Sequence, residues 1–260
     1  MKIIVLLKQV PDTTEISVDY ETGTLIRQGV ASIMNPDDKA GLEEALKIKD
    51  KYDAHVTVLS MGPLQAEYML KEALAMGADD AILLTDRKFA GSDTWATSSI
   101  LSGALEKMEY DLIIAGRQAI DGDTAQVGPQ TAEKLDIPHV TYIEEIESVE
   151  ENSITLKRQF EFGYQRINVS FPCLITTLSE MNTPRFMHAT GIVDAMQQDI
   201  KIITREDIIV NDEEIGLKGS PTKVKRTFTK ESQAKSDLIM VSASEAASKI
   251  VSVLDTNNII

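Results

Sequence analysis

The sequence predicts an α/β protein built on a doubly wound, mostly parallel sheet. Two observations predict this fold. Short apolar runs rich in valine, isoleucine and leucine recur along the first half of the chain, and segments with helical periodicity lie between them. Runs this short do not make buried helices, so we expect parallel strands that helices cover on both faces. Strand and helix alternate in this way up to about residue 135.

The four expected strands are "IIVLL" at 3–7, "HVTVLS" at 55–60, "AILL" at 81–84 and "LIIA" at 112–115. The first helix is expected in "PDDKAGLEEALKIKDKY", which opens with proline and two acids, the residues that a helix N-terminus prefers. The second is expected in "PLQAEYMLKEALAMGAD", where apolar residues recur one turn apart. Gly77 is expected to end that helix in a left-handed conformation.

Two regions break the alternation. "ISVDYETGTLIRQG" (16–29) alternates apolar and polar residues around "ETG", which predicts a β-hairpin inserted after the first strand. Residues 141–177 also show period-2 alternation, with a turn at "EENS". This pattern predicts antiparallel strands that either join the sheet or stack beside it.

The composition changes after Leu178. Long apolar runs become rare, and residues 200–240 are charged and poorly periodic. We expect an extended C-terminal arm that leans on a partner and ends in the helix "SASEAASKIVSVLD"; an ordinary flexible tail is the alternative. The expected division is an α/β domain over 1–178 and a partner-binding segment and arm over 179–260.

Charge and hydropathy exclude several classes of function. The 260 residues are 43% hydrophobic, enough for a sizeable core, and 41 acidic against 26 basic residues give a net charge of -15. This charge repels phosphate backbones and anionic lipid, so we expect no nucleic-acid partner. The sequence lacks the ~18 consecutive apolar residues of a membrane span and a cleavable signal, so we expect a cytoplasmic protein with no membrane insertion.

Few residues suggest catalytic or metal chemistry. The single cysteine, Cys173, lies in "FPCLITT" and is expected to be a small buried side chain. His55, His139 and His188 are far apart, without the spacing of zinc ligands, and Trp95 is expected in the core. The motifs GxxxxGK[ST] and GxSxG do not occur, so neither P-loop phosphoryl transfer nor a nucleophile-elbow hydrolase is supported.

A ligand site is expected where the strands end. In an open parallel sheet, ligands bind beyond the carboxyl ends of the strands, at the point where the strand order reverses. Three loops fit this rule: "KQVPDT" at 8–13, "SMGPL" at 60–64 and "GRQAIDGDTAQVGPQTAEKL" at 116–135. Each contains glycine or proline at turn positions, so the backbone can approach a ligand closely.

The third loop has the features of an anion site. Pro129 is tolerated only in the first turn of a helix, so a helix is expected to begin within residues 125–128 and to leave their amides free. Free amides and the positive end of the helix dipole bind a phosphate without any lysine, and the small residues Gly122, Ala125 and Gly128 let it come close. On this basis Gly128→Asp is expected to release a nucleotide while the subunit stays folded.

The same loop carries negative charge. Asp121 and Asp123 cannot face a phosphate at close range, because like charges in a partly dry site repel by roughly several kcal/mol. They are expected to cap backbone amides, accept ribose hydroxyls or hold the loop in shape. The pattern alone leaves two interpretations open, a nucleotide site and an ordinary turn before a helix.

Three segments then carry a family resemblance. "GRQAIDGDTAQVGP" resembles the adenine-nucleotide loop of the electron transfer flavoprotein beta subunit, and "NPDDKAGLEEALKIK" (35–49) and "LKRQFEFGYQRINVSFPCLITT" (156–177) resemble two further segments of that family. They occur in the family's order, and the similarity runs over nearly the whole chain. The resemblance implies an adenine-nucleotide-binding, Rossmann-like fold and a heterodimer with an alpha subunit.

The resemblance also implies electron transfer. Ordinary beta subunits hold a structural AMP, whereas electron-bifurcating ones hold FAD that accepts hydride from NADH. One electron then goes to the alpha-subunit FAD and on to an acyl-CoA dehydrogenase, and the other goes to ferredoxin or flavodoxin. "VPDT" at 10–13 and "AIDGDTAQVGP" resemble the bifurcating type. A non-bifurcating beta subunit with AMP and a stand-alone nucleotide-binding module remain the alternatives.

The implied site holds neither a metal nor a catalytic acid or base, because a flavin accepts hydride directly. The implied cofactor-binding residues are Leu7, Lys8, Val10, Asn35, Asp38, Ser60, Met61, Gly62, Gly116, Gln118, Asp121, Gly122, Asp123, Thr124, Ala125, Gln126, Val127, Gly128 and Pro129. "NTPRFMHATG" (182–191) resembles the family's recognition loop, which docks on the dehydrogenase. The implied partner-binding residues are Pro184, Arg185, Phe186, Met187, Ala189 and Ile192. Ordinary members have an anchoring leucine at the position of Ala189, so Met187 or Ile192 is expected to replace it, or the partner surface differs.

Overall fold

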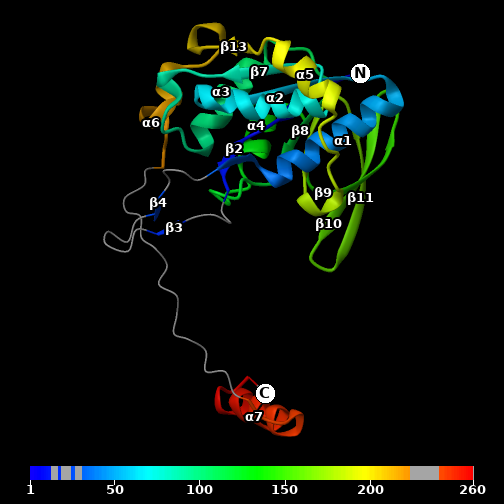
Figure 1. Ribbon diagram of the computed structural model, residues 1–260, viewed down its shortest axis with the longest axis vertical. Coiled ribbons are helices and arrows are strands. Elements are labelled where there is room, and N and C mark those ends of the chain that lie inside the picture. Colours follow the sequence, from blue (N-terminus) through cyan, green and yellow to red (C-terminus); the bar gives the residue numbers. More distant parts are fainter. Residues whose placement is uncertain (13–16, 19–24, 27–30, 223–239, 260) are drawn as a thin grey trace. The chain divides into compact units, whose positions relative to one another are not determined.

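The computed structural model describes residues 1–12, 17–18, 25–26, 31–222 and 240–259. Within these residues, nine strands form one sheet in the order β11-β10-β9-β12-β8-β1-β6-β7-β13 (Figure 1). The neighbours from β9 to β13 pair in parallel, whereas β10 is antiparallel to both β9 and β11. The strands are β1 (Lys2–Leu6), β6 (His55–Met61), β7 (Asp80–Leu84), β8 (Leu112–Gly116), β9 (His139–Val149), β10 (Ser153–Phe160), β11 (Gly163–Ser170), β12 (Cys173–Thr177) and β13 (Lys201–Ile203).

Helices cover both faces of this sheet. The α-helices are α1 (Pro36–Tyr52), α2 (Glu67–Met76), α3 (Thr94–Leu105), α4 (Val127–Lys134), α5 (Ala189–Gln197), α6 (Gly216–Gly219) and α7 (Ala243–Thr256). Side chains of α1, α2 and α5 share one buried cluster with the sheet, and side chains of α3 and α4 share a second. Apolar strands buried between two helical layers confirm the predicted α/β fold with a mostly parallel sheet.

The local predictions for the first half of the chain are confirmed. The four apolar runs are β1, β6, β7 and β8, and the segment from Pro36 to Tyr52 is one helix. α2 ends at Gly77, whose φ of 128° is reached at little cost only by glycine. Strong periodicity and clear helix ends account for this agreement.

The predicted hairpin after the first strand is described only in part. β3 (Ser17–Val18) pairs antiparallel with β4 (Leu25–Ile26), and residues 19–24 between them lie outside the described residues. A second antiparallel pair joins β2 (Gln9–Pro11) to β5 (Ser32–Met34). The strands expected after residue 140 belong to the main sheet, and β10 is antiparallel to β9 and β11 as predicted. The prediction is wrong for residues 173–177, which form β12 and pair in parallel with β8 and β9, because this strand lies inside the sheet and not at its antiparallel edge.

Two single side chains had been assigned to the core. Cys173 is buried in β12, and burial raises the pKa of its thiol to about 12, so the cysteine is a small core residue as predicted. Trp95 is 42% exposed, so its assignment to the core is wrong. It lies in the first turn of α3, where Ala96 and Ile100 face the core instead, and its ring lies 3.4 Å from the ammonium of Lys134.

The compact body extends beyond residue 178, where the sequence placed the start of the arm. The chain divides into two units, Met1–Arg226 and Thr227–Ile260. α5 packs on α2, and β13 adds to the sheet beside β7, so this part of the expected arm is folded into the body. In the second unit the expected closing helix is α7, in which no residue is buried. None of the described helices is long and apolar enough to cross a membrane.

Candidate functional site

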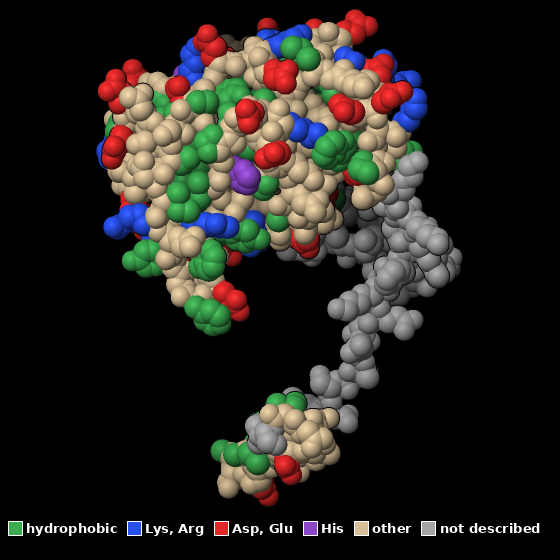
Figure 2. Space-filling model, turned by 180° about the vertical axis from the view of Figure 1, so that it is seen from behind, with side chains coloured by type: hydrophobic (Ala, Val, Ile, Leu, Met, Phe, Trp, Pro, Cys, Tyr) green, Lys and Arg blue, Asp and Glu red, His purple; other side chains and the backbone are tan. Residues whose placement is uncertain are grey.

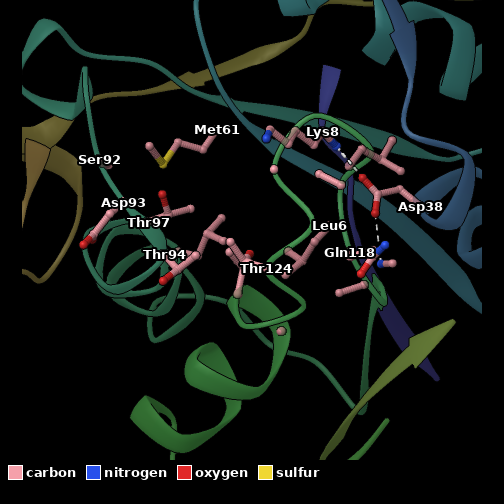
Figure 3. A pocket seen from close by; sticks show the side chains of 18 of the residues that line it. Leu6, Lys8, Asp38, Met61, Ser92, Asp93, Thr94, Thr97, Gln118 and Thr124 are labelled. Atoms are coloured by element: carbon pink, nitrogen blue, oxygen red, sulfur yellow. Dashed lines mark hydrogen bonds between the residues drawn. The ribbon is translucent and has the colours of Figure 1, made fainter. Parts of the chain in front are cut away.

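A cavity of about 390 Å³ opens at the carboxyl edge of the sheet, beside β1 and β8, where the strand order reverses. Its inner wall is apolar and its rim is polar. The apolar side chains are Leu6, Leu7, Leu59, Met61, Phe89, Leu101, Ala115, Ala119 and Val127. In Figure 3, Ser92, Asp93, Thr94 and Thr97 lie on one side of the cavity, Lys8, Asp38 and Gln118 on the other, and Thr124 between them. The cavity suits a ligand with an apolar ring and a polar end.

The N-terminus of α4 borders the cavity. The helix begins at Val127, within the range predicted from Pro129. Among the described residues, no protein acceptor takes a hydrogen bond from the backbone amides of residues 124–128. The first turn of α4 carries no acid. Five consecutive donors and the positive end of the helix dipole are therefore available to an anion.

The loop before α4 has an unusual backbone. Asp123 and Ala125 both have positive φ angles, 49° and 53°. Left-handed residues in such a loop turn successive amides toward one concave side, which is the geometry of an anion-binding nest. Non-glycine residues in this region of φ/ψ space are strained, and such residues cluster at ligand sites. No atom of the described residues lies within 4 Å of a Cβ placed on Gly122, so this part of the chain leaves the approach to the loop open.

Both acids of this loop are engaged within the chain. The carboxylate of Asp121 lies 2.7 Å from the ammonium of Lys8, and that of Asp123 accepts a hydrogen bond of 2.9 Å from the side-chain Nε2 of Gln118. Of the three roles expected for these aspartates, the structure assigns to both the one of holding the loop in shape. The positive charge of Lys8 also offsets the negative charge of Asp121 beside the free amides.

Residues before and within the first turn of α1 also hold the loop before α4 in place. The side-chain amide of Asn35 donates to the carbonyl of Gln118 at 2.8 Å, and its oxygen accepts from the amide of Ile120 at 3.1 Å. The carboxylate of Asp38 accepts from the amides of Lys8 at 2.7 Å and Gly116 at 3.0 Å. The start of α1 thus joins the ends of β1 and β8.

The carboxyl of Asp38 has a perturbed pKa. Burial raises its pKa from 3.8 to about 7, and hydrogen bonds from Asn35, Lys8 and Gly116 act in the opposite direction. A Cβ on Gly116 would lie 2.1 Å from this carboxylate, so only glycine fits there.

Asp37, which the sequence analysis missed, has a similar role. Its carboxylate accepts from the amides of Gln118 at 3.3 Å and Ser179 at 3.0 Å, and it lies 3.4 Å from Nε of Arg117. The available signal was the acid pair after "NP", which we interpreted only as a helix N-terminus preference.

Comparison with known proteins identifies the family. The model described as "Electron transfer flavoprotein domain" matches residues 22–207, well over half of the chain. The chain belongs to the electron transfer flavoprotein family. Over 254 residues it is 53% identical to the electron transfer flavoprotein subunit beta of Clostridium acetobutylicum, covering 98% of each protein. It is 50% identical to the caffeyl-CoA reductase-Etf complex subunit CarD of Acetobacterium woodii, covering all of both, and 47% identical to the acryloyl-CoA reductase electron transfer subunit gamma of Anaerotignum propionicum, covering 88% of both.

In this member of the family, about half of the implied cofactor-binding residues line the cavity. Those that do are Leu7, Lys8, Asp38, Met61, Gly116, Gln118, Gly122, Thr124, Val127 and Gly128. Those that are not among its lining residues are Val10, Asn35, Ser60, Gly62, Asp121, Asp123, Ala125, Gln126 and Pro129. Asn35 is fully buried, and the hydroxyl of Ser60 is buried without a partner among the described residues.

Sequence reasoning missed one wall of the cavity. The loop after β7 and the start of α3 contribute Phe89, Gly91, Ser92, Asp93, Thr94 and Thr97. The hydroxyl of Thr94 donates to the side-chain oxygen of Gln126 at 2.9 Å, which joins this wall to the loop before α4. The rule for strand ends applied equally to the run "AILL" and would have selected this loop.

The prediction that Gly128→Asp releases a nucleotide while the subunit stays folded is also wrong. A Cβ on Gly128 would lie 2.9 Å from Cγ2 of Thr176 and 3.5 Å from Cδ2 of Leu174, so this position faces the sheet. The carboxylate of Gly128→Asp would enter the packed layer between α4 and β12 and destabilise the fold. Gly122 is the position where a side chain reaches open space.

The implied partner-binding residues are not all at the surface. Residues 182–188 have no regular structure, and α5 begins at Ala189. Phe186 is 91% exposed, and Met187 and Ile192 are also exposed. Arg185 instead pairs with acids of α1.

Proposed function

We propose that this chain is the beta subunit of an electron-bifurcating electron transfer flavoprotein, and that its cavity binds FAD that accepts hydride from NADH. The observation that carries the proposal is the row of amides at residues 124–128, which have no acceptor within the described chain and lie beside the cavity. A diphosphate needs several donors, and a helix N-terminus supplies them with a favourable dipole. The free amides of residues 124–128 and the cavity beside them fit a nucleotide with a diphosphate, such as FAD.

The chain's residues hold and orient the nucleotide in this proposal. The amides from Thr124 to Gly128 bind the phosphates, and the adenosine half lies on the side of the cavity that the family resemblance implies, beside Lys8 and Met61. Asn35 and Asp38 fix the loop that carries the phosphate site. The bound flavin supplies the electron chemistry, so the chain needs no acid or base side chain for hydride acceptance.

One observation favours the second candidate, a beta subunit that holds AMP. A volume of about 390 Å³ is near the lower end of the ~300 to 1,000 Å³ that ligand sites occupy. It suits a nucleoside monophosphate or one half of a dinucleotide. In the FAD proposal, this cavity would hold one half of the dinucleotide.

The proposed partners follow from the exposed parts of the chain. α7 exposes Ile250, Val251 and Val253, and we assign this helix to an alpha subunit. Residues 182–192 are assigned to an acyl-CoA dehydrogenase, in line with the CoA reductases named in two relatives. Ferredoxin or flavodoxin takes the second electron.

The test is to purify the chain with its alpha subunit, record bleaching of the flavin by NADH, and then count nucleotides after denaturation. Two FAD per heterodimer and rapid bleaching are the expected result. One FAD and one AMP would show that the redox chemistry belongs to the partner subunit and would reject the bifurcating proposal.

A further inference from the structure

Residues 182–188, called here the docking segment, are held on α1 by an arginine that turns inward. Nε of Arg185 donates to Oε2 of Glu43 at 2.9 Å, and Nη2 donates to Oε1 at 3.1 Å. The backbone amide of Arg185 donates to the same Oε2 at 2.9 Å. Nη2 also reaches Asp50 at 2.8 Å. The main chain and the side chain of one residue therefore enclose a single carboxylate.

A second contact fixes the start of the segment. The side-chain amide of Asn182 donates to the carbonyl of Ala40 at 2.9 Å and to the carboxylate of Glu44 at 2.8 Å. Because α1 is continuous from residue 36 to residue 52, the segment cannot shift along the helix without breaking both contacts. Its position is thus fixed at its first residue and at its middle residue.

The pair of Arg185 with Glu43 is largely removed from solvent. The side chain of Glu43 is 6% exposed and that of Arg185 is 25% exposed. Hydrogen bonding to Glu43 raises the pKa of the guanidinium above its ordinary range, so the charge is permanent. Removing one partner leaves the other charge buried and unpaired, which is far more costly than losing a surface ion pair.

The hydrogen bonds that Arg185 makes to Glu43, called here the clamp, also affect the neighbouring residue Phe186. Phe186 follows Arg185 directly and is 91% exposed, although the residue before it is fixed to the body. A large aromatic side chain on a rigid base is the form of a binding hot spot, because little conformational entropy is lost when it docks. Ala189, at the position where ordinary family members have an anchoring leucine, has too small a side chain for that role. Met187 and Ile192, which were expected to replace it, are about half as exposed as Phe186, at 45% and 43%.

We infer that Arg185 is a positioning residue, which through Glu43 fixes the docking segment on α1 so that Phe186 enters an apolar pocket of the acyl-CoA dehydrogenase. The inference rests on the proposed function for the identity of that partner. A 50% identical relative is named as a subunit of a caffeyl-CoA reductase-Etf complex, which favours a CoA-dependent flavoenzyme as the occupant.

The same helix also carries the nucleotide loops. Asn35 and Asp38 at the start of α1 hold the ends of β1 and β8, while Glu43, Glu44 and Asp50 hold the docking segment. A partner bound through Phe186 is therefore placed relative to the cavity by one rigid element. This placement gives the clamp a functional reason beyond local stability.

The first experiment does not depend on the dehydrogenase. Hydrogen exchange of the docking segment is compared in heterodimers that carry the wild-type chain, Arg185→Lys, Arg185→Gln and a control, Arg166→Gln. We expect exchange at least tenfold faster in Arg185→Gln, an intermediate rate in Arg185→Lys, which keeps the charge without the fork, and no change in the control.

Arg166 is a matched control because it also pairs with a glutamate. Its Nε lies 2.6 Å from Oε2 of Glu147, but its side chain is 66% exposed. The pair joins β11 to β9, in the antiparallel strands whose projecting end carries hydrophobic side chains in Figure 2. Unchanged exchange in Arg185→Gln would overturn the positioning role.

The second experiment measures electron transfer from the heterodimer to purified acyl-CoA dehydrogenases. We expect the KM for the dehydrogenase to rise about tenfold in Phe186→Ala and in Arg185→Gln, while kcat at saturating dehydrogenase changes less than twofold. Because Arg185 acts through Phe186, the double variant should be no worse than Phe186→Ala alone.

The remaining outcomes would contradict either the positioning role of Arg185 or the proposed function on which it rests. Additive effects in the double variant, or a normal KM in Arg185→Gln despite faster exchange, would overturn it. Loss of the alpha subunit from Phe186→Ala would place the segment in the subunit interface and overturn it also. If the wild-type heterodimer reduces none of the dehydrogenases tested, the proposed function is contradicted. The exchange measurement would still show whether Arg185 fixes the docking segment on α1.

Discussion

The helices α1 and α4 begin at the same edge of the sheet, yet their N-termini differ in charge. α1 has Asp37 and Asp38 in its first turn, and these carboxylates accept hydrogen bonds from amides of three other segments. α4 has no acid in its first turn, and the amides of residues 124–128 have no acceptor in the described chain. The two helices share the same kind of dipole.

The difference shows how a helix N-terminus becomes structural or ligand-binding. At α1, side-chain carboxylates occupy the positive end of the helix and use their remaining lone pairs to hold the surrounding loops. At α4, small residues leave that end open, and the nearby acids pair with Lys8 and Gln118 instead. A loop can therefore carry its own negative charge and still accept an anion, provided that its acids are engaged elsewhere.

The largest effect is expected at Gly116, which contacts the first turn of α1 and begins the loop that leads to α4. In Gly116→Ala, the new Cβ would be 2.1 Å from Oδ1 of Asp38 and 2.8 Å from Cβ of Asp37. Both neighbours are buried, so the start of α1 must shift. We expect unfolding of the heterodimer to become easier by about 3 kcal/mol and bound nucleotide to be lost, measured by denaturant titration and by nucleotide content.

Gly122→Ala is the matched control. Its added Cβ has no neighbour within 4 Å in the part of the chain that the structure describes, so it should change neither stability nor nucleotide content. Equal losses in both variants would mean that loop flexibility, and not the contact with Asp38, explains the effect.

The charge of α1 can be tested by pH. Because burial raises the pKa of Asp38 to about 7 from 3.8, the protonated carboxyl favours the folded state. This contribution is present in full below about pH 4 and is lost as the pH rises through about 7. We expect the free energy of unfolding to fall by roughly 2 to 4 kcal/mol over this range, and Asp38→Asn to remove the dependence. Identical pH profiles for the two proteins would contradict the shift.

The fold could be predicted from the sequence because its signals are local. Apolar runs of strand length, the proline and acids before α1 and the glycine after α2 each define an element without tertiary information. The continuation of the first unit beyond residue 178 could not be predicted, since β13 and α5 are short and gain their stability from the edge of the sheet and from α2. Trp95 was misassigned because composition does not tell which side of a helix faces the core.

The site could be predicted only in part for a similar reason. The helix start and the free amides follow from Pro129 alone. The roles of Asn35, Asp37 and Arg185 depend on contacts between segments about 80 to 140 residues apart, and no spacing rule reveals these contacts. A buried polar residue far along the chain looks like a surface residue until the fold brings its partner to it.

The open end of α4 can be tested by closing it. In Gly122→Asp, the carboxylate enters open space beside the amides and repels a phosphate, as the acids of α1 would. We expect nucleotide affinity of the heterodimer to fall roughly 10- to 30-fold with stability changed by less than about 1 kcal/mol, measured by calorimetry and thermal unfolding. Normal affinity would move the phosphate away from this loop.

The smallest effect is expected at Lys8, whose ammonium offsets Asp121 beside the same amides. Because both side chains are partly exposed, Lys8→Gln should change stability by less than about 1 kcal/mol. Asp121 then lacks its counter-charge, so we expect nucleotide affinity to fall about threefold at low salt and to approach the wild-type value at 0.5 M salt, where the unpaired charge is screened. The variant Asp121→Asn in the Lys8→Gln background should restore affinity, because it removes the charge that Lys8 offsets. A loss that persists in this double variant would instead mean that Lys8 contacts the phosphate directly, and the charge of the loop would then not be balanced within the chain alone.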